Sequence, residues 1–571
     1  MKQKQSSKLP AGLLVILAAG LVVVCIACAF LVVMQSSRNQ QPATGTPTAA
    51  DPKNATLALA YSPEKATLIK ELVDGFNKTR QRTSDGQVME VTLLEMPPDQ
   101  MVQAALSDEP GFQALSPDAS LWLDQIDLTW AERHRQKEGD VAARRIADSA
   151  RYAVSPIVIA TWPDVAASLG QDGGRVSWGD IQQRAATDPN FRWSHASTSY
   201  ASGVLATLAK FYAGAGKTRG LTEQDVLAQP TLDYVRNVER TISLYGENEA
   251  VAMQRMRSEG RKFLDVLVAQ EALVVQHNLS GGDPLVAIYP HEGTLWEDHP
   301  LALLDAPTVT DNQRRTFRAL ADFLLQPEQQ KRILAQGFRP ADLSIPIDGA
   351  DSPLSAANGV DPKEPQTTLQ LPGPAVVQVV QNAWQYTKRP SNVYLVVDTS
   401  GSMEGDKLDN VKTALQTFID QIQGTQDRVG MVEFASAVYN VISPQPLDDA
   451  HRATLRSEVD QLQAGGDTAL LDGVRAAYVR LQQQADTESI NAIVAMTDGN
   501  ENASNISLNR LVSQIQRENG SGVPVVIFTI AYGDDADLNL LRSVAEASGG
   551  QMRVGSVETI RELYRLLSQY F

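Results

Sequence analysis

The sequence has almost no cysteine: Cys25 and Cys28 are its only two, and both lie in one apolar segment near the amino terminus. The lack of thiols after residue 28 excludes a disulfide framework and a thiolate metal site from the rest of the chain. Histidine is also scarce, with six residues, and none has an evident nucleophile to pair with. No phosphate-binding loop and no zinc-ligand cluster can be identified. We therefore expect no enzyme.

Basic residues are in the minority, with 50 Lys and Arg against 67 Asp and Glu and a net charge of -17. An acidic surface repels a phosphate backbone, so a nucleic-acid partner is disfavoured. Solubility is the ordinary explanation of such a charge, and a role in gathering cations needs a defined site. The apolar content of 43% is normal for a folded chain, and 571 residues suggest about three to four folded units.

Residues 9–34 form one long apolar run without any charge. A bilayer core requires about 20 such residues in a helix, so this run predicts a transmembrane signal-anchor. A cleavable signal would have a shorter apolar core and a small-residue exit. Lipidation at Cys28 is the other alternative, but apolar rather than polar residues follow that cysteine.

The charges beside this run predict its orientation. Lys2, Lys4 and Lys8 precede it, whereas Arg38 alone follows it closely. The positive-inside rule then leaves residues 1–8 in the cytoplasm and the bulk of the chain outside the cell membrane. Residues 35–53 are mostly Ser, Gln, Pro, Thr and Ala, which is typical of a flexible tether.

Residues 54–345 alternate strand-like and helical patterns. Residues 56–61 are strand-like, and Ser62-Pro63-Glu64 then supplies an N-cap, a proline at the first helical position and an acidic first turn. Apolar residues follow at helical spacing, and residues 88–94 return as a strand. This strand-helix-strand opening indicates a parallel α/β sheet.

The same region resembles the extracellular solute-binding proteins of bacterial transport systems, which have the two-lobed periplasmic-binding fold. The resemblance is carried by the order and spacing of YSPEKATLIKELVDGFNK, VSWGDIQQRAATDPNFRWSHASTSYASG, LVAIYPHEGTLWEDHPLALLDAP and FRALADFLLQPEQQKRILAQGFRP. It implies a ligand site between the lobes, at Ser62, Ser120, Ser199 and Ser202. Helix N-termini with small hydroxyl residues suit a ligand oxygen. Ordinary helix capping is the alternative role of these serines.

Residues 346–390 connect this region to the last one. Residues 346–374 are rich in Pro, Gly, Asp and Ser, which predicts a linker. Apolar residues between positions 376 and 384 lie on one helical stripe, which we expect to pack against a flanking domain.

Oxygen-bearing side chains gather in three loops of the last region. Residues 393–397 form a buried-strand pattern that ends in Asp398-Thr399-Ser400-Gly401-Ser402, and Thr468 opens a helix further along. Residues 493–497 form a second such strand, which ends in Asp498. Because carboxyl ends of parallel strands share one edge of a sheet, we expect the five groups to converge: Asp398, Ser400, Ser402, Thr468 and Asp498.

This donor set favours a hard divalent cation. Oxygen-only donors with two carboxylates select Mg²⁺, Ca²⁺ or Mn²⁺ over zinc or copper, and Mg²⁺ is our first choice. Mg²⁺ takes about six oxygens, so a carboxylate of a partner protein would complete the shell. A chance match of Asp-x-Ser-x-Ser and a nucleophilic serine are the alternatives, although no histidine is suitably placed to activate one.

The pattern resembles the metal-ion-dependent adhesion site of von Willebrand factor A-type (VWA) domains, and the resemblance covers residues 391–571. It implies a Rossmann-like parallel sheet flanked by helices. It also implies that Ser400, Ser402 and Thr468 bind the ion directly, and that Asp398 and Asp498 bind it directly or through water.

Three functions follow as hypotheses. The first is a membrane-anchored surface protein that binds a partner protein through the cation, with the solute-binding-like region as a sensor or stem. The second is a solute receptor of a transport system, in which the A-type domain is an assembly device. The third, a cytosolic partner of an ATP-driven machine, conflicts with the predicted anchor orientation.

Overall fold

The computed structural model describes residues 53–571 apart from 135–142, 171–174, 247, 534 and 558. The predicted transmembrane segment, residues 9–34, and nearly all of the tether lie outside the described residues. Within the described ranges, no helix is both long enough and apolar enough to cross a membrane. Residues Lys53–Phe571 form one compact unit. The prediction of a mixed α/β fold is confirmed.

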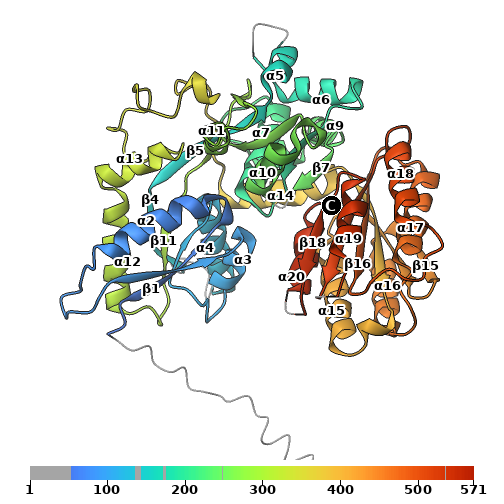
Figure 1. Ribbon diagram of the computed structural model, residues 1–571. Helices are drawn as coiled ribbons and strands as arrows, with labels where there is room; N and C mark the ends of the chain where they lie inside the picture. The colour runs from blue at the N-terminus through green and yellow to red at the C-terminus, as the bar shows by residue number, and fades with distance from the viewer. Residues whose placement is uncertain (1–52, 135–142, 171–174, 247, 534, 558) are drawn as a thin grey trace, which may run out of the picture. The chain divides into compact units, whose positions relative to one another are not determined.

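The first lobe contains a five-stranded sheet of order β2-β1-β3-β11-β4 (Figure 1). Its strands are β1 Thr56–Tyr61, β2 Glu90–Glu95, β3 Ala114–Ser116, β4 Ile146–Arg151 and β11 Pro300–Leu304. The opening strands β1, β2 and β3 are parallel as predicted, whereas β11 runs antiparallel to β3 and β4. Its helices are η1 Pro63–Lys65, α2 Ala66–Lys78, α3 Pro98–Ala105, α4 Leu121–Arg133, α12 Asp311–Leu324 and α13 Pro327–Ala335.

Alternating side chains of β1 enter two cores. Leu57 and Leu59 pack with the apolar faces of α2 and α12, whereas Ala60 packs with residues of α3 and α4. A strand covered on both faces should be largely apolar, and residues 57–61 of β1 are apolar. Helices therefore cover both faces of this sheet, and the carboxyl ends of β1 and β3 remain at one edge.

The second lobe is built on the sheet β10-β5-β8-β6-β7, with β9 and β12 pairing with β5. Its strands are β5 Ala153–Thr161, β6 Trp193–Ala196, β7 Leu244–Gly246, β8 Val266–Gln270, β9 Val286–Ile288, β10 Trp296–Glu297 and β12 Arg339–Pro340. Its helices are α5 Pro163–Leu169, α6 Trp178–Thr187, α7 Ala201–Ala215, α8 Glu223–Leu227, α9 Gln229–Glu239, α10 Glu249–Glu259, η2 Gly260–Lys262 and α11 Glu271–Leu279. Since β4 leads into β5, β10 leads into β11, and α13 leads into β12, the chain passes between the two lobes three times.

The segment predicted as a linker is packed against the second lobe. Ala287 N donates to Gly359 O at 2.7 Å, and Leu369 N donates to Thr294 O at 2.8 Å. Leu354, Val360 and Leu369 are buried, so apolar residues spaced through a polar stretch hold it in place. It contains η3 Ala356–Asn358 and leads into α14 Pro374–Thr387.

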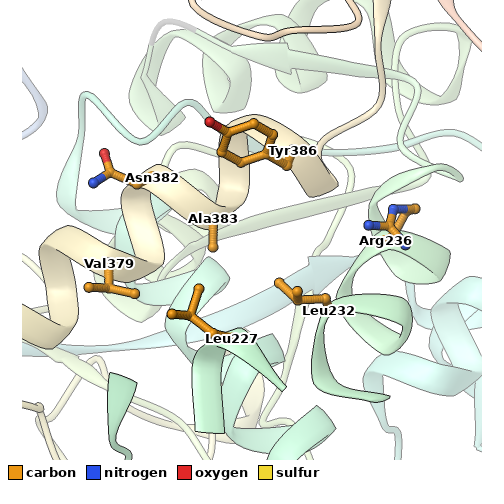
Figure 2. A pocket seen from close by; sticks show the side chains of 7 residues that line it. All are labelled: Leu227, Leu232, Arg236, Val379, Asn382, Ala383 and Tyr386. Carbon is orange, nitrogen blue, oxygen red and sulfur yellow. The ribbon is translucent and has the colours of Figure 1, made fainter. Parts of the chain in front are cut away.

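Helix α14 packs against α7, α8 and α9 through the predicted apolar stripe, in which Val380, Ala383 and Trp384 are buried. Beside this contact, α8, α9 and α14 line an open pocket of about 290 Å³. Figure 2 shows its lining residues: Leu227, Leu232, Arg236, Val379, Asn382, Ala383 and Tyr386. The lining holds none of the predicted ligand-binding serines.

The last region contains a six-stranded sheet of order β15-β14-β13-β16-β17-β18. The strands are β13 Ser391–Asp398, β14 Arg428–Phe434, β15 Val438–Pro446, β16 Ile490–Thr497, β17 Val525–Tyr532 and β18 Met552–Gly555. The helices are η4 Gly401–Met403, α15 Asp406–Gln421, α16 Asp449–Gln461, α17 Leu470–Gln484, α18 Leu508–Asn519, α19 Leu538–Glu546 and α20 Ile560–Ser568. All neighbours pair in parallel except β14 and β15.

Strand β13 lies at the centre of this sheet and is buried along its whole length. Val393, Leu395 and Val397 face a core with α15, α16 and α20, whereas Tyr394 and Val396 face a core with α17, α18 and α19. The sheet is therefore doubly covered, as predicted. The loops that follow β13 and β16 meet at its carboxyl edge.

Candidate metal centre

Asp398 is the last residue of β13, and its side chain is fully buried. Its Oδ1 accepts a hydrogen bond from Ser400 N at 2.7 Å, and its Oδ2 accepts one from Thr497 Oγ1. Burial raises the pKa of Asp398, while the bonds from Thr497 and Ser400 oppose that rise. The carboxylate thus links the β13 loop to the end of β16.

The two serines of the first loop contact each other, and Ser402 also contacts Asp498. Ser400 Oγ and Ser402 Oγ are 3.1 Å apart, and Ser402 Oγ donates to Asp498 Oδ1 at 2.5 Å. Asp498 follows β16 directly and is fully buried. Hydroxyls in mutual contact beside a carboxylate can turn their oxygen lone pairs to a cation, because each hydroxyl both donates and accepts.

Thr468 enters from the third loop. Its backbone N–H donates to Asn502 Oδ1 at 2.9 Å, and its carbonyl accepts from Asn502 N at 3.1 Å. A Cβ on Gly499 would lie 3.1 Å from Thr468 Oγ1 and 3.3 Å from Ser402 Oγ. The two hydroxyls therefore flank the same glycine, so the structure brings the three loops together.

Three residues that the sequence reasoning missed complete the surroundings. Thr497 donates to Asp398, Gly499 leaves room for the hydroxyls, and Lys407 Nζ contacts Asp498 Oδ2 at 2.5 Å. Lys407 is the second residue of α15. A cation in a first helical turn is unfavourable beside the helix dipole. The position of a lysine in a first helical turn was therefore a feature of the sequence that could have indicated an acidic partner for Lys407.

The donors fit a hard divalent cation. Three hydroxyls and two carboxylates converge, and the close approach at Gly499 shapes a cradle that a larger residue would fill. No described group of three or more His, Cys, Asp or Glu side chains is placed to hold a metal. Three hydroxyls with two carboxylates form an oxygen-only donor set, which suits Mg²⁺, Ca²⁺ or Mn²⁺.

Replacing Gly499 tests this geometry. We expect Gly499→Ala to lower Mg²⁺ affinity at least about tenfold, because the added methyl group would displace the Thr468 and Ser402 hydroxyls. Mutations that disturb the groups around metal ligands typically lower metal affinity roughly 10- to 100-fold. Gly465→Ala is the matched control, since a Cβ there meets no atom within 4 Å. Isothermal titration calorimetry measures both affinities. Equal affinities would mean that Gly499 does not border the ion.

The four serines predicted to bind a solute lie at helix starts of the two lobes. Ser62 is fully buried and donates to the Glu64 carboxyl without capping η1. Ser120 precedes α4, and its backbone N–H donates to Asp298 Oδ1 at 2.7 Å. Ser202 is buried in the first turn of α7 beside Glu249. The Ser199 backbone N–H donates to Ser197 Oγ at 3.4 Å. Three of the four serine positions contact acidic side chains. Their role in ligand binding stays a prediction.

Two family models match this chain. The bacterial extracellular solute-binding protein matches residues 57–339, and the von Willebrand factor type A domain matches residues 392–569. A Synechocystis protein of uncharacterised function is 26% identical over 199 residues, which cover 34% of this chain and 45% of the relative. The chain thus spans under half of that relative.

Other similarities extend over different parts of the chain. An uncharacterised protein of Mycobacterium tuberculosis is 21% identical over 532 residues, which cover 87% of this chain and 73% of that protein. Among solved structures, a von Willebrand factor type A protein from Catenulispora acidiphila shares 23% identity over 32% of this chain and 43% of its own, with a TM-score of 0.28. The sulfate-binding protein SubI from M. tuberculosis shares 15% identity over 51% of this chain and 88% of its own, with a TM-score of 0.36. The chain therefore carries a domain of the bacterial extracellular solute-binding type followed by a von Willebrand factor type A domain.

Proposed function

We propose that the protein is an extracytoplasmic binding protein, anchored in the cell membrane by residues 9–34, whose VWA domain holds a partner protein through a divalent cation. The convergence of Ser402, Thr468 and Asp498 around Gly499 supports this proposal most strongly. Both domains are of binding types, and neither is of an enzymatic type.

The chemistry of the centre explains the need for a partner group. Ser400, Ser402 and Thr468 would hold the ion directly, with Asp398 and Asp498 bound directly or through water. Since Lys407 already offsets part of the charge of Asp498, a dipositive ion keeps excess positive charge. A carboxylate of the partner would complete its oxygen shell.

A second candidate function is a solute receptor, with the VWA domain as an assembly device. It is favoured by the acidic surroundings of the predicted solute-binding serines. In the first candidate the same region serves as a sensor or stem. The two differ in whether the first domain binds a small molecule.

Capture of partners with and without cation tests the proposal. The full chain in detergent serves as bait for membrane and envelope extracts, once in MgCl₂ and once in EDTA. We expect at least one protein to be retained in Mg²⁺ and lost in EDTA. A set of captured proteins that is identical in both would contradict cation-dependent binding. The anchor is tested by protease added to intact cells, which should digest residues 53–571 and would spare them if they were cytoplasmic.

A further inference from the structure

Four buried carboxyl groups from the two lobes cluster at strand ends around a single lysine. Glu64 and Lys65 follow β1, Asp118 follows β3, Glu249 begins α10 and Glu297 ends β10. Their exposed fractions are 8%, 1%, 1%, 2% and 0% in that order. Helix α10 of the second lobe contacts η1 of the first. The acids therefore meet between the two sheets.

Two of these acids have full sets of partners. Asp118 accepts from Trp122 Nε1 at 2.6 Å and from Ala201 N at 2.8 Å. The Glu249 carboxyl accepts two hydrogen bonds from Gln270, one from the Gln270 backbone N–H at 3.1 Å and one from the Gln270 side-chain amide at 2.8 Å. These bonds tie the two carboxyl groups to the ends of α7 and β8.

Glu297 is different, because neither of its carboxyl oxygens has a hydrogen-bond partner among the described residues. Glu64 Oε2 also has none. His299 Nε2 lies 3.8 Å from Glu297 Oε2, but burial and the nearby Lys65 hold the pKa of His299 well below its usual range. The neutral imidazole instead faces Gln270 Oε1 at 3.2 Å. An unpartnered buried carboxyl is costly, so Glu297 calls for a donor.

Lys65 shows that the cluster accommodates an ammonium group. Its Nζ donates to Pro117 O and lies 5.8 Å from the centroid of the Tyr152 ring. Glu64, Asp118 and Glu297 all interact with this ammonium electrostatically. One cation therefore interacts with three of the four acids of the cluster. Burial raises the pKa of Glu64 to about 7 and that of Glu249 to about 8, so protonation of these carboxyl groups removes part of the excess negative charge.

We propose that this acidic cluster binds an organic solute through a second ammonium group, which donates to Glu297 and to the free oxygen of Glu64. The proposal rests on the receptor function of the first domain and not on the cation centre of the VWA domain. A metal ion fits less well, because no described group of three or more acids and histidines is placed to ligate one. An anion would be repelled by the unpartnered carboxyl oxygens of Glu297 and Glu64 wherever these groups are ionised. Since all four acids are buried, the lobes must part for the solute to enter.

The test uses a defined diamine. The full chain in detergent, with EDTA present, is titrated with 1,4-diaminobutane in a calorimeter, and 1,4-butanediol serves as the uncharged counterpart. We expect the diamine to bind and the diol to give no heat. Glu297→Gln should weaken the diamine about 10- to 100-fold, the usual cost of losing a hydrogen bond to a charged group. Glu328→Gln, whose side chain is 72% exposed, should leave the affinity unchanged.

Stability supplies a second readout. Glu297→Met removes an unpartnered polar group and keeps the side-chain volume, so Tm without ligand should rise while diamine binding is lost. Absence of diamine binding, or equal binding by Glu297→Gln, would overturn the proposal. Binding of Mg²⁺ in EDTA-free buffer that Glu297→Gln abolishes would show a metal site instead. Glu297→Gln should still capture protein partners in MgCl₂, so failure here leaves the proposed function of the VWA domain untouched.

Discussion

Asp398→Asn is expected to lower Mg²⁺ affinity about 100-fold or more while the VWA domain stays folded. The amide keeps the shape of a side chain that spans Ser400 N and Thr497 Oγ1, but it removes one of the two formal negative charges of the centre. Loss of a carboxylate near the ion should lower Mg²⁺ affinity by more than mutation of a residue that only hydrogen-bonds to a metal ligand, which typically costs roughly 10- to 100-fold. Calorimetry with MgCl₂ measures the affinity.

The control is Asp467→Asn, which removes an exposed carboxylate from the loop that bears Thr468. This change should leave Mg²⁺ affinity within about twofold, because exposed charges are screened by solvent and salt. If both variants bound Mg²⁺ as the parent does, Asp398 would have no role at the ion. If both lost binding equally, the effect would be one of net charge and not of position.

Lys210→Met is expected to destabilise the second lobe by about 3–5 kcal/mol, the usual cost of leaving a buried charge without its partner. Lys210 Nζ contacts Glu239 Oε1 and lies 2.8 Å from His195 Nε2, and Tyr245 donates to Glu239 Oε2 at 2.8 Å. All four side chains are fully buried. Although burial opposes ionisation, Lys210 and His195 hold the pKa of Glu239 well below its usual range.

Denaturant unfolding followed by tryptophan fluorescence measures this loss. Trp178 and Trp193 are suitable reporters, because Lys210 Nζ lies 5.6 Å from the centroid of each ring. Lys331→Met, at an exposed position of α13, is the control and should change stability by less than about 0.5 kcal/mol. The double variant Lys210→Met with Glu239→Leu should lose less than the single one, since no lone charge remains. A Lys210→Met variant as stable as the control would show that the ion pair is not required.

Much of the fold could be predicted from local patterns. Strands β13 and β16 are continuous apolar runs, and α12 and α14 show clear helical stripes, because burial on one or both faces leaves a periodic signature. Strand β15 left no such signature. It lies at a sheet edge, is mostly half-buried or exposed, and contains Pro444 and Pro446, so pairing with β14 rather than burial defines it.

The packing of residues 346–374 was also missed, because Leu354, Val360 and Leu369 are isolated in a sequence that otherwise reads as a linker. Their burial depends on contacts with the second lobe, which no local pattern encodes. Composition alone predicted a linker, and the structure shows that this linker packs against the second lobe.

The residues of the candidate sites were likewise predicted only in part from the sequence. The five donors of the VWA domain could be named because strand ends and a helix start mark them in sequence. Lys407 and Gly499 could not, since their roles depend on which loops face each other in space. In the first domain, Glu64 and Lys65 look like exposed residues of an ordinary first helical turn. In the structure both residues are buried, and α10 of the second lobe contacts the short helix η1 that contains them.

The most direct test of the central claim, a cation held by three loops of the VWA domain, is a crystal structure of the protein grown or soaked in MnCl₂, with anomalous data that locate manganese. We expect one anomalous peak bounded by Ser400 Oγ, Ser402 Oγ and Thr468 Oγ1. A map with no peak at these three oxygens, in crystals whose soak reaches the sheet edge, would contradict it.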